Sequence, residues 1–375
     1  GDREMAMCKS GAWWDTAGHR SLANNSAVYE TKPSFSEYIQ EWSALYDSHS
    51  GERGICNREA MEKIARLAGR RVEGHSFGTN PCSEIILRSK QFCNLSTIVA
   101  KNKDGIKDIL EKTHLATVLG TLQSALTNFA FFEERGDYTF RDNCNEERLL
   151  GVSITGIMDA HGLWDDELLQ AMKSVAHDTN REWAEYLDIN PSSSITCVKP
   201  EGTTSCVAGS ASGMHPRFSK FYIRRVRLDT KDPIGQLMKD AGVPWEPCVM
   251  RPENTLVFSF PIASPANALT QDDLSAMDHL QWWKDFQINY CDHKPSITVS
   301  YTDDEFLGVG EWVWNNWDIV SGISFLPKED HVYQQAPFEA IDEVTWAMMM
   351  DEMPKEVDWN LLSKYELEEI GRAHV

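Results

Sequence analysis

The sequence predicts an α/β protein in which strands and helices alternate along the chain. Apolar runs rich in β-branched residues recur from position 93 onward, and helical segments separate them. The chain has 375 residues, 42% hydrophobic and 25% charged, which is typical of a soluble globular protein with one large core or two domains. Together these observations favour βα units with parallel strands.

The strand and helix patterns of this region can be placed by residue range. Strands are expected at 149–158, 194–198, 254–262, 296–302 and 321–326. Helices are expected between them at 104–134, 166–187, 232–241, 271–290 and 304–317. Alternation alone does not distinguish an open sheet from a closed barrel.

The first part of the chain is expected to be helical. Pro33 suits a first helical turn, aromatic and apolar residues then recur at spacings of three and four, and Gly51 ends the helix. Asn57 is expected to cap a second, basic helix that continues to Arg71.

Charge and cysteine content exclude some functions. A formal net charge of −21 argues against binding of nucleic acid polymers, which need a positive surface, although a single nucleotide needs only a local site. No apolar run is long enough to span a bilayer, so no membrane partner is expected. Nine cysteines, an odd number scattered over a long chain, fit reduced thiols in a cytoplasm.

The stretch 78–87 carries the strongest functional signal. Cys82 stands two residues before Glu84, and in extended backbone this spacing places both side chains on one side. Pro81 favours a rigid loop over a helix, and Cys93 brings a second sulfur near that loop. A free cysteine taken alone is more often a packing residue, and the spacing of eleven between the two cysteines matches no zinc site.

The run Asn80-Pro81-Cys82-Ser83-Glu84, followed by Cys93-Asn94-Leu95, resembles the finger loop of ribonucleotide reductase large chains. The likeness is closest to the adenosylcobalamin-dependent class II ribonucleoside-triphosphate reductases and covers nearly the whole chain. It implies a ten-stranded α/β barrel of two five-stranded halves, with the finger loop threaded through its centre. This chain would hold that loop and the second half.

The resemblance also implies a division of the chain and a missing upstream region. Its parts would be a helical segment leading into the barrel, the finger loop, the second barrel half, an acidic helical tail and a non-biological end that resembles a translated sequencing adapter. These parts correspond to residues 1–77, 78–100, 101–330, 331–369 and 370–375.

The resemblance assigns roles to four residues of the loop. Cys82 would become the thiyl radical that abstracts the 3′-hydrogen of the ribose, and Glu84 would accept the 3′-hydroxyl proton. Asn80 would hydrogen-bond the sugar, and Cys93 would be one of the two thiols that reduce it. The chemistry needs a dithiol because two electrons must be delivered.

A second motif follows the strand expected at 194–198. A small-residue turn at Gly202, Thr203, Thr204 and Ser205 leads into an expected helix that begins at Thr203. Free amides at a helix N-terminus bind anions, but such turns are common and the signal is weak by itself. The resemblance assigns these four residues to the substrate phosphates.

The resemblance to the cobalamin class implies adenosylcobalamin as cofactor and no protein metal site. The adjacent tyrosines typical of class I are missing, since the corresponding segment reads Ile323-Ser324-Phe325-Leu326-Pro327. The glycyl-radical class lacks the equivalent of Glu84. Implied partners are a ribonucleoside triphosphate, thioredoxin or another dithiol, and a deoxynucleotide effector bound through the upstream region.

Three alternatives remain open. The chain could be a class I large chain, or a non-catalytic piece that lacks the other reductant cysteine. It could also be a cysteine hydrolase that uses Cys82 or Cys93 with one of eleven histidines. The hydrolase is disfavoured because Glu84 is the near partner, whereas a thiolate is best activated by a cation.

Overall fold

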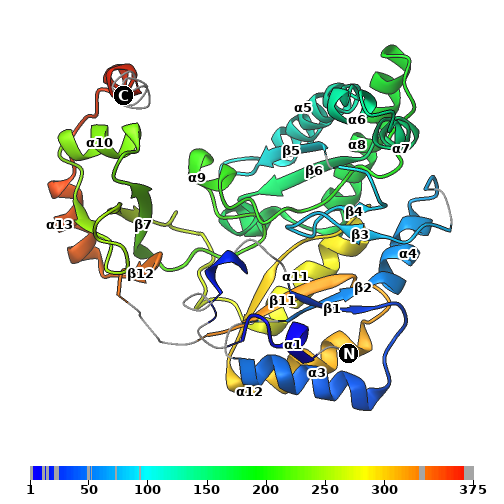
Figure 1. Cartoon of the computed structure of the whole chain (residues 1–375), viewed down its shortest axis with the longest axis horizontal. Coiled ribbons are helices and arrows are strands. Elements are labelled where there is room, and N and C mark those ends of the chain that lie inside the picture. The colour runs from blue at the N-terminus through cyan, green and yellow to red at the C-terminus, as the bar shows by residue number, and fades with distance from the viewer. Residues whose placement is uncertain are drawn as a thin grey trace. The chain divides into compact units, whose positions relative to one another are not determined.

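The computed structural model describes residues 3–10, 13, 17–20, 25–48, 51, 53–71, 74–92, 94–328 and 334–366 (Figure 1). Cys93 and the tail 370–375 therefore lie outside the described residues. The chain forms two compact units. Unit 1 comprises Gly1–Pro216, Asn267–Leu269 and Asp273–Glu329, and unit 2 comprises Arg217–Ala266, Thr270–Asp272 and Asp330–Val375.

The sheets of unit 1 are short but connected. One has the order β1-β2-β11-β10, in which β1 with β2 and β10 with β11 are parallel while β2 and β11 are antiparallel. A second pairs β5 with β6 in parallel. The strands are β1 (Ser26–Tyr29), β2 (Gly54–Asn57), β5 (Asn94–Val99), β6 (Leu150–Thr155), β10 (Thr298–Tyr301) and β11 (Gly322–Pro327).

Two isolated parallel bridges link these sheets. Val152 of β6 pairs with Thr196, and Val198 pairs with Pro295, which lies just before β10. Backbone pairing therefore runs from β5 through β6 and the 196–198 segment to β10, β11, β2 and β1. This is a mixed α/β arrangement, as predicted, although β1 and β2 were not expected from the sequence.

Long helices cover unit 1. They are α3 (Phe35–Ser48), α4 (Arg58–Leu67), α5 (Ile106–Ser124), α8 (Asp166–Tyr186), α11 (Ala276–Asn289) and α12 (Asp303–Asn315). The shorter ones are α1 (Arg3–Ala6), α6 (Ala130–Glu133), α7 (Thr139–Glu147) and α9 (Thr204–Ala208), with 3-10 turns η1 (Gly18–Arg20) and η2 (Ile157–Leu163).

Local capping explains where several of these helices begin. Asn57 caps α4 as predicted, with its Oδ1 accepting from the Ala60 amide, although α4 ends at Leu67, before Arg71. Ser275 and Asp278 form a capping box that starts α11 at Ala276, five residues later than predicted.

Helices α3 and α12 pack together beside the first sheet (Figure 1). The Trp42 ring stacks on Phe306 with centroids 4.8 Å apart, and the Tyr38 hydroxyl donates to the Gly310 carbonyl at 2.7 Å. Gly310 is required here, because a Cβ at this position would lie 2.5 Å from the Trp42 indole nitrogen. Ser26, Cys56, Thr298 and Ser324 of this sheet border the cavity described below.

Unit 2 is built on an antiparallel sheet. Its order is β12-β7-β9-β8, and β7 pairs with β9 over nine residues, from Phe221 with Ala263 to Asp229 with Thr255. The elements are β7 (Phe221–Asp229), α10 (Pro233–Asp240), β8 (Trp245–Pro247), β9 (Thr255–Ala263), β12 (Phe338–Ala340), α13 (Glu343–Glu352) and η3 (Trp359–Leu361).

The predicted parallel arrangement is therefore wrong for the strand expected at 254–262. That strand is β9, and all of its pairings are antiparallel. Residue pattern along a strand reports which face is buried, whereas the direction of its neighbour depends on chain segments distant in sequence.

Candidate active site

A short antiparallel pair frames the 78–87 stretch. Strands β3 (Gly78–Thr79) and β4 (Ile86–Leu87) form the two sides of the loop. At its tip the Asn80 carbonyl accepts from the Ser83 amide at 2.9 Å, and the Asn80 Oδ1 accepts from the Ile85 amide at 3.0 Å. The stretch forms a rigid loop and no helix, as predicted.

The expected extended backbone at the tip is wrong. Ser83 has φ of 69°, a left-handed conformation that reverses the chain between Cys82 and Glu84. As a result the Cys82 side chain is exposed, whereas Glu84 is fully buried. The two groups still interact electrostatically, since the Glu84 charge contributes to raising the pKa of the Cys82 thiol.

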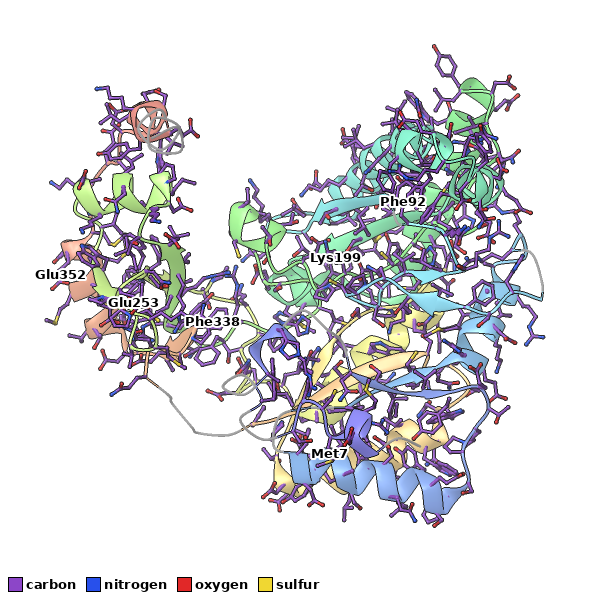
Figure 2. The ribbon with its side chains drawn as sticks, viewed as in Figure 1. Met7, Phe92, Lys199, Glu253, Phe338 and Glu352 are labelled. Carbon is purple, nitrogen blue, oxygen red and sulfur yellow. The ribbon has the colours of Figure 1, made fainter. Side chains whose placement is uncertain are left out.

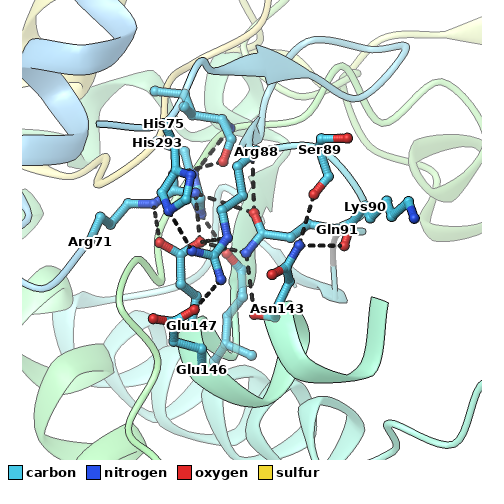
Figure 3. A network of polar contacts seen from close by, with 12 residues as sticks. Arg71, His75, Arg88, Ser89, Lys90, Gln91, Asn143, Glu146, Glu147 and His293 are labelled. Carbon is cyan, nitrogen blue, oxygen red and sulfur yellow. Dashed lines mark hydrogen bonds and ion pairs between the residues drawn. The ribbon is translucent and has the colours of Figure 1, made fainter. Parts of the chain in front are cut away.

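The base of the loop is held by a network of buried polar contacts (Figure 3). Arg71 forms an ion pair with Glu147, Nη2 to Oε2 3.0 Å, in which each side chain is 1% exposed. Arg71 Nη1 also donates to the Ile86 carbonyl at 2.7 Å, and Gln91 Nε2 donates to Glu147 Oε2 at 2.5 Å. Burial alone would raise the pKa of Glu147, but Arg71 and Gln91 outweigh it and hold that pKa below its ordinary value.

His293 also hydrogen-bonds the backbone of this loop (Figure 3). Its Nδ1 accepts from the Ile86 amide at 3.2 Å, and its Nε2 lies 3.0 Å from the Leu150 carbonyl, to which it donates. Complete burial, together with the nearby Arg71 charge, lowers the pKa of His293 to about 3. The ring is therefore neutral, as its acceptor role at Nδ1 requires.

Cys82 opens onto a cavity of about 500 Å³ in unit 1. Its wall combines the loop tip with the polar face of the first sheet, and includes the side chains of Asn25, Ser26, Cys56, Ser83, Lys294, Ser296, Thr298 and Ser324. Partial burial and the Glu84 charge raise the pKa of the Cys82 thiol, and only Lys199 opposes them appreciably. Cys82 is thus a neutral thiol, which argues against a thiolate hydrolase.

Glu84 is the unusual group of the site. Its side chain is 0% exposed, and neither carboxylate oxygen has a hydrogen-bond partner among the described residues. A buried carboxylate without partners is costly and is common where a proton must be taken up. Asn80 is half-buried, and its Nδ2 makes no hydrogen bond within the described part of the chain, so it is available as a donor.

The predicted phosphate turn lies beside this site. Lys199, labelled in Figure 2, precedes it, and of the turn itself Gly202 and Thr203 are exposed, Thr204 is half-buried and Ser205 is buried. The helix begins at Thr204 with Thr203 as its N-cap, so it is one residue later than expected and only five residues long. None of the four residues lines the cavity, to which this segment contributes Pro200.

The described residues contain no group of three His, Cys, Asp or Glu side chains arranged to hold a metal ion. Within the same residues, none of the helices combines the length and apolar character needed to cross a membrane.

The chain was compared with protein families, curated proteins and solved structures. No protein-family model matches the chain. An adenosylcobalamin-dependent ribonucleoside-triphosphate reductase of Lacticaseibacillus paracasei is 27% identical over 373 residues, which cover 88% of this chain and 47% of that protein. A probable enzyme of the same name from Dictyostelium discoideum is 27% identical over 367 residues, covering 92% of this chain and 45% of that protein.

The chain is similar to adenosylcobalamin-dependent ribonucleoside-triphosphate reductases. The resemblance predicted from the finger loop is thereby confirmed, and the class I alternative is not favoured. The chain spans about half the length of the curated relatives it matches.

The fold agrees with this similarity. A crystal structure of a B12-dependent class II ribonucleotide reductase matches with a TM-score of 0.74 and 22% identity, covering 97% of this chain and 54% of that chain. The α/β fold of the ribonucleotide reductases is therefore present.

Sequence reasoning missed several side chains of the site. Cys56 and Lys294 line the cavity with Cys82, and Asn25 lines it with a buried Nδ2 that has no partner among the described residues. Glu201 is 1% exposed, its Oε1 accepts from Thr97 Oγ1 at 2.8 Å, and its charge acts on Cys82. No spacing rule identifies them, because each reaches the site from a different part of the chain.

Proposed function

We propose that this chain carries the catalytic core of an enzyme that reduces ribonucleoside triphosphates to 2′-deoxyribonucleotides through a thiyl radical on Cys82. One observation carries the proposal. A neutral thiol opens onto a cavity of about 500 Å³, and two residues further along the chain a fully buried carboxylate has no hydrogen-bond partner among the described residues. The similarity to named reductases supports the same reaction.

The proposal includes a barrel architecture for the catalytic core. The run of backbone pairing from β5 to β1 is consistent with one part of a ten-stranded barrel around the tip of the finger loop, 78–100, whose last residues form β5. Segment 101–330 would supply the second half of the barrel apart from the antiparallel strands of unit 2. Segments 1–77 and 331–369 would flank it.

The residues of this chain account for the proton and hydrogen transfers. The sulfur radical at Cys82 removes the 3′-hydrogen of the ribose, and Glu84 accepts the 3′-hydroxyl proton. Asn80 Nδ2 donates to the sugar. The 2′-hydroxyl leaves as water with a proton from a dithiol, which also supplies the hydrogen that C2′ gains and, having given two electrons, becomes a disulfide. Glu84 then returns its proton to the 3′-oxygen, and Cys82 returns the hydrogen to C3′, which regenerates the sulfur radical. Cys93 is proposed as one of these thiols.

Adenosylcobalamin is the proposed cofactor, and the site fits such a group in one respect. Cys82 and Pro81 are exposed at the loop tip, so a large cofactor can meet the sulfur from outside while the ribose occupies the cavity. When bound, adenosylcobalamin supplies the organic radical that removes the hydrogen atom from the thiol. The chain's own contribution is to hold the thiol neutral and accessible.

The remaining partners follow from the reaction. Gly202, Thr203, Thr204 and Ser205 are proposed to bind the substrate phosphates, supported by the exposure of Gly202 and Thr203 beside the site. Thioredoxin or another dithiol would regenerate the thiols, and a deoxynucleotide effector would act through the region upstream. A cytoplasmic location would keep the thiols reduced.

The test is replacement of Cys82 by serine in the full-length protein, supplied with adenosylcobalamin, a ribonucleoside triphosphate and a dithiol. Deoxynucleotide formation should stop while nucleotide binding stays near normal, because serine preserves the loop but cannot carry the sulfur radical. Cys8→Ser is the matched control, since Cys8 is half-buried in the same unit and does not line the cavity. Turnover by the Cys82→Ser variant would exclude Cys82 from the mechanism.

A further inference from the structure

Lys294 is a buried cation at the wall of the cavity. It lies between α11 and β10, is 2% exposed, and its Nζ donates to Ser83 Oγ at 2.9 Å and to the Gly322 carbonyl at 2.7 Å. One ammonium thus ties the loop tip to β11. Gly322 makes room for it, because a Cβ there would lie 2.8 Å from Nζ.

This arrangement is costly for the fold. Burial lowers the pKa of Lys294 to about 8, and the described residues place no carboxylate within ion-pair distance of its Nζ. A buried ammonium is normally paired or replaced by an apolar side chain of similar size. Two neutral hydrogen bonds therefore do not explain why a lysine occupies this position.

Glu84 is the negatively charged group that interacts with the buried Lys294 ammonium. It lies one residue beyond Ser83, it is fully buried, and its oxygens have no partner in the described part of the chain. The Glu84 charge acts through space on Lys294 and favours its protonated form.

We propose that Lys294 is a positioning residue that anchors the Cys82–Glu84 turn through Ser83 and places its positive charge where it acts on the Glu84 carboxylate, the proposed acceptor of the substrate proton. This inference rests on the proposed function and deepens it. The ammonium acts on the carboxylate without a direct ion pair that would occupy the oxygens needed for the proton. The Ser83 contact also maintains the left-handed turn that separates the exposed thiol from the buried base.

The experiment compares Lys294→Met with wild type in the full-length protein, with adenosylcobalamin, a ribonucleoside triphosphate and a dithiol. We expect kcat to fall about tenfold or more while KM for the nucleotide changes little. The acid limb of the pH profile of kcat/KM should move up by about one pH unit, because loss of a positive neighbour raises a carboxylate pKa.

Further variants separate charge from structure. Lys284→Met is the matched control, because Lys284 is a half-buried lysine that donates to Asn316 Oδ1 at 2.9 Å and does not line the cavity. It should leave kcat and the pH profile unchanged. Lys294→Ala should recover activity with added ethylamine, which can enter through the cavity. Ser83→Ala, which keeps the ammonium, should lower kcat without moving the acid limb.

Each outcome bears on a different claim. An unmoved acid limb in Lys294→Met, or a loss of activity in Lys294→Ala that ethylamine does not restore, would overturn the inference while leaving the reductase intact. Should Lys294→Met fail to fold, the Ser83→Ala and ethylamine results decide the matter. An inactive wild-type protein would overturn the proposed function and this inference with it.

Discussion

Buried charged groups have hydrogen-bond partners at the base of the finger loop, whereas the buried carboxylate at its tip has none among the described residues. At the base, Arg71 and Gln91 both contact the Glu147 carboxylate, and Arg71 and His293 hydrogen-bond the loop backbone at Ile86. At the tip, Glu84 is buried with no hydrogen-bond partner among the described residues. The difference separates the part of the loop that polar contacts hold in place from the carboxyl group proposed to accept a proton, since a satisfied carboxylate would be a poor proton acceptor.

The largest expected effect on stability comes from the base. Glu147→Gln leaves the Arg71 guanidinium buried without its ion-pair partner, and we expect the free energy of unfolding to fall by about 3 kcal/mol. Urea denaturation measures it. Asp318→Asn is the control, because the Lys63–Asp318 pair is 47% and 63% exposed and should contribute less than about 1 kcal/mol. Equal losses in the two variants would contradict the assigned role of the base.

The same substitution at the tip should have the opposite result. Glu84→Gln replaces a buried unpartnered carboxylate with a neutral amide, which is less costly to bury, so stability should be unchanged or higher. Deoxynucleotide formation should fall by about 100-fold or more, because the proton acceptor is lost. The two readouts are urea denaturation and turnover of the full-length protein. A variant that is destabilised yet active would refute the comparison.

Measured over a single pH unit, the smallest effect is a pH dependence of the base. The fold lowers the pKa of His293 from 6.5 to about 3, so the unfolded chain takes up a proton near pH 6.5 that the folded protein does not. The stability contributed by the neutral ring is complete above pH 6.5 and is lost as pH falls toward 3, with a slope of about 1.4 kcal/mol per pH unit.

His293→Gln isolates this effect from other titrating groups, among them His279, whose burial also lowers its pKa to about 3. Between pH 5.5 and 4.5 the variant should lose stability less steeply than wild type, by about 1.4 kcal/mol per pH unit, in urea titrations at each pH. Parallel slopes would mean that His293 is not held neutral by the fold.

Features that depend on a few neighbouring residues could be predicted from the sequence. The Asn57 cap, the positions of α8 and α12, and the rigid loop at Pro81 follow from side chains within a turn or two of the backbone that they affect. The backbone reversal at Ser83 could not be predicted, since a left-handed serine has no local signal comparable to glycine.

By itself, the sequence determined the chemistry available at the loop, a thiol, a carboxyl and an amide within five residues, because covalent spacing limits how far apart they can lie. Only the tertiary structure decided that the thiol is exposed and the carboxyl buried, that β9 pairs antiparallel, and that Lys294 meets Ser83 across 211 positions of sequence. Contacts of that kind depend on how the whole chain packs, so the spacing of neighbouring residues in the sequence does not predict them.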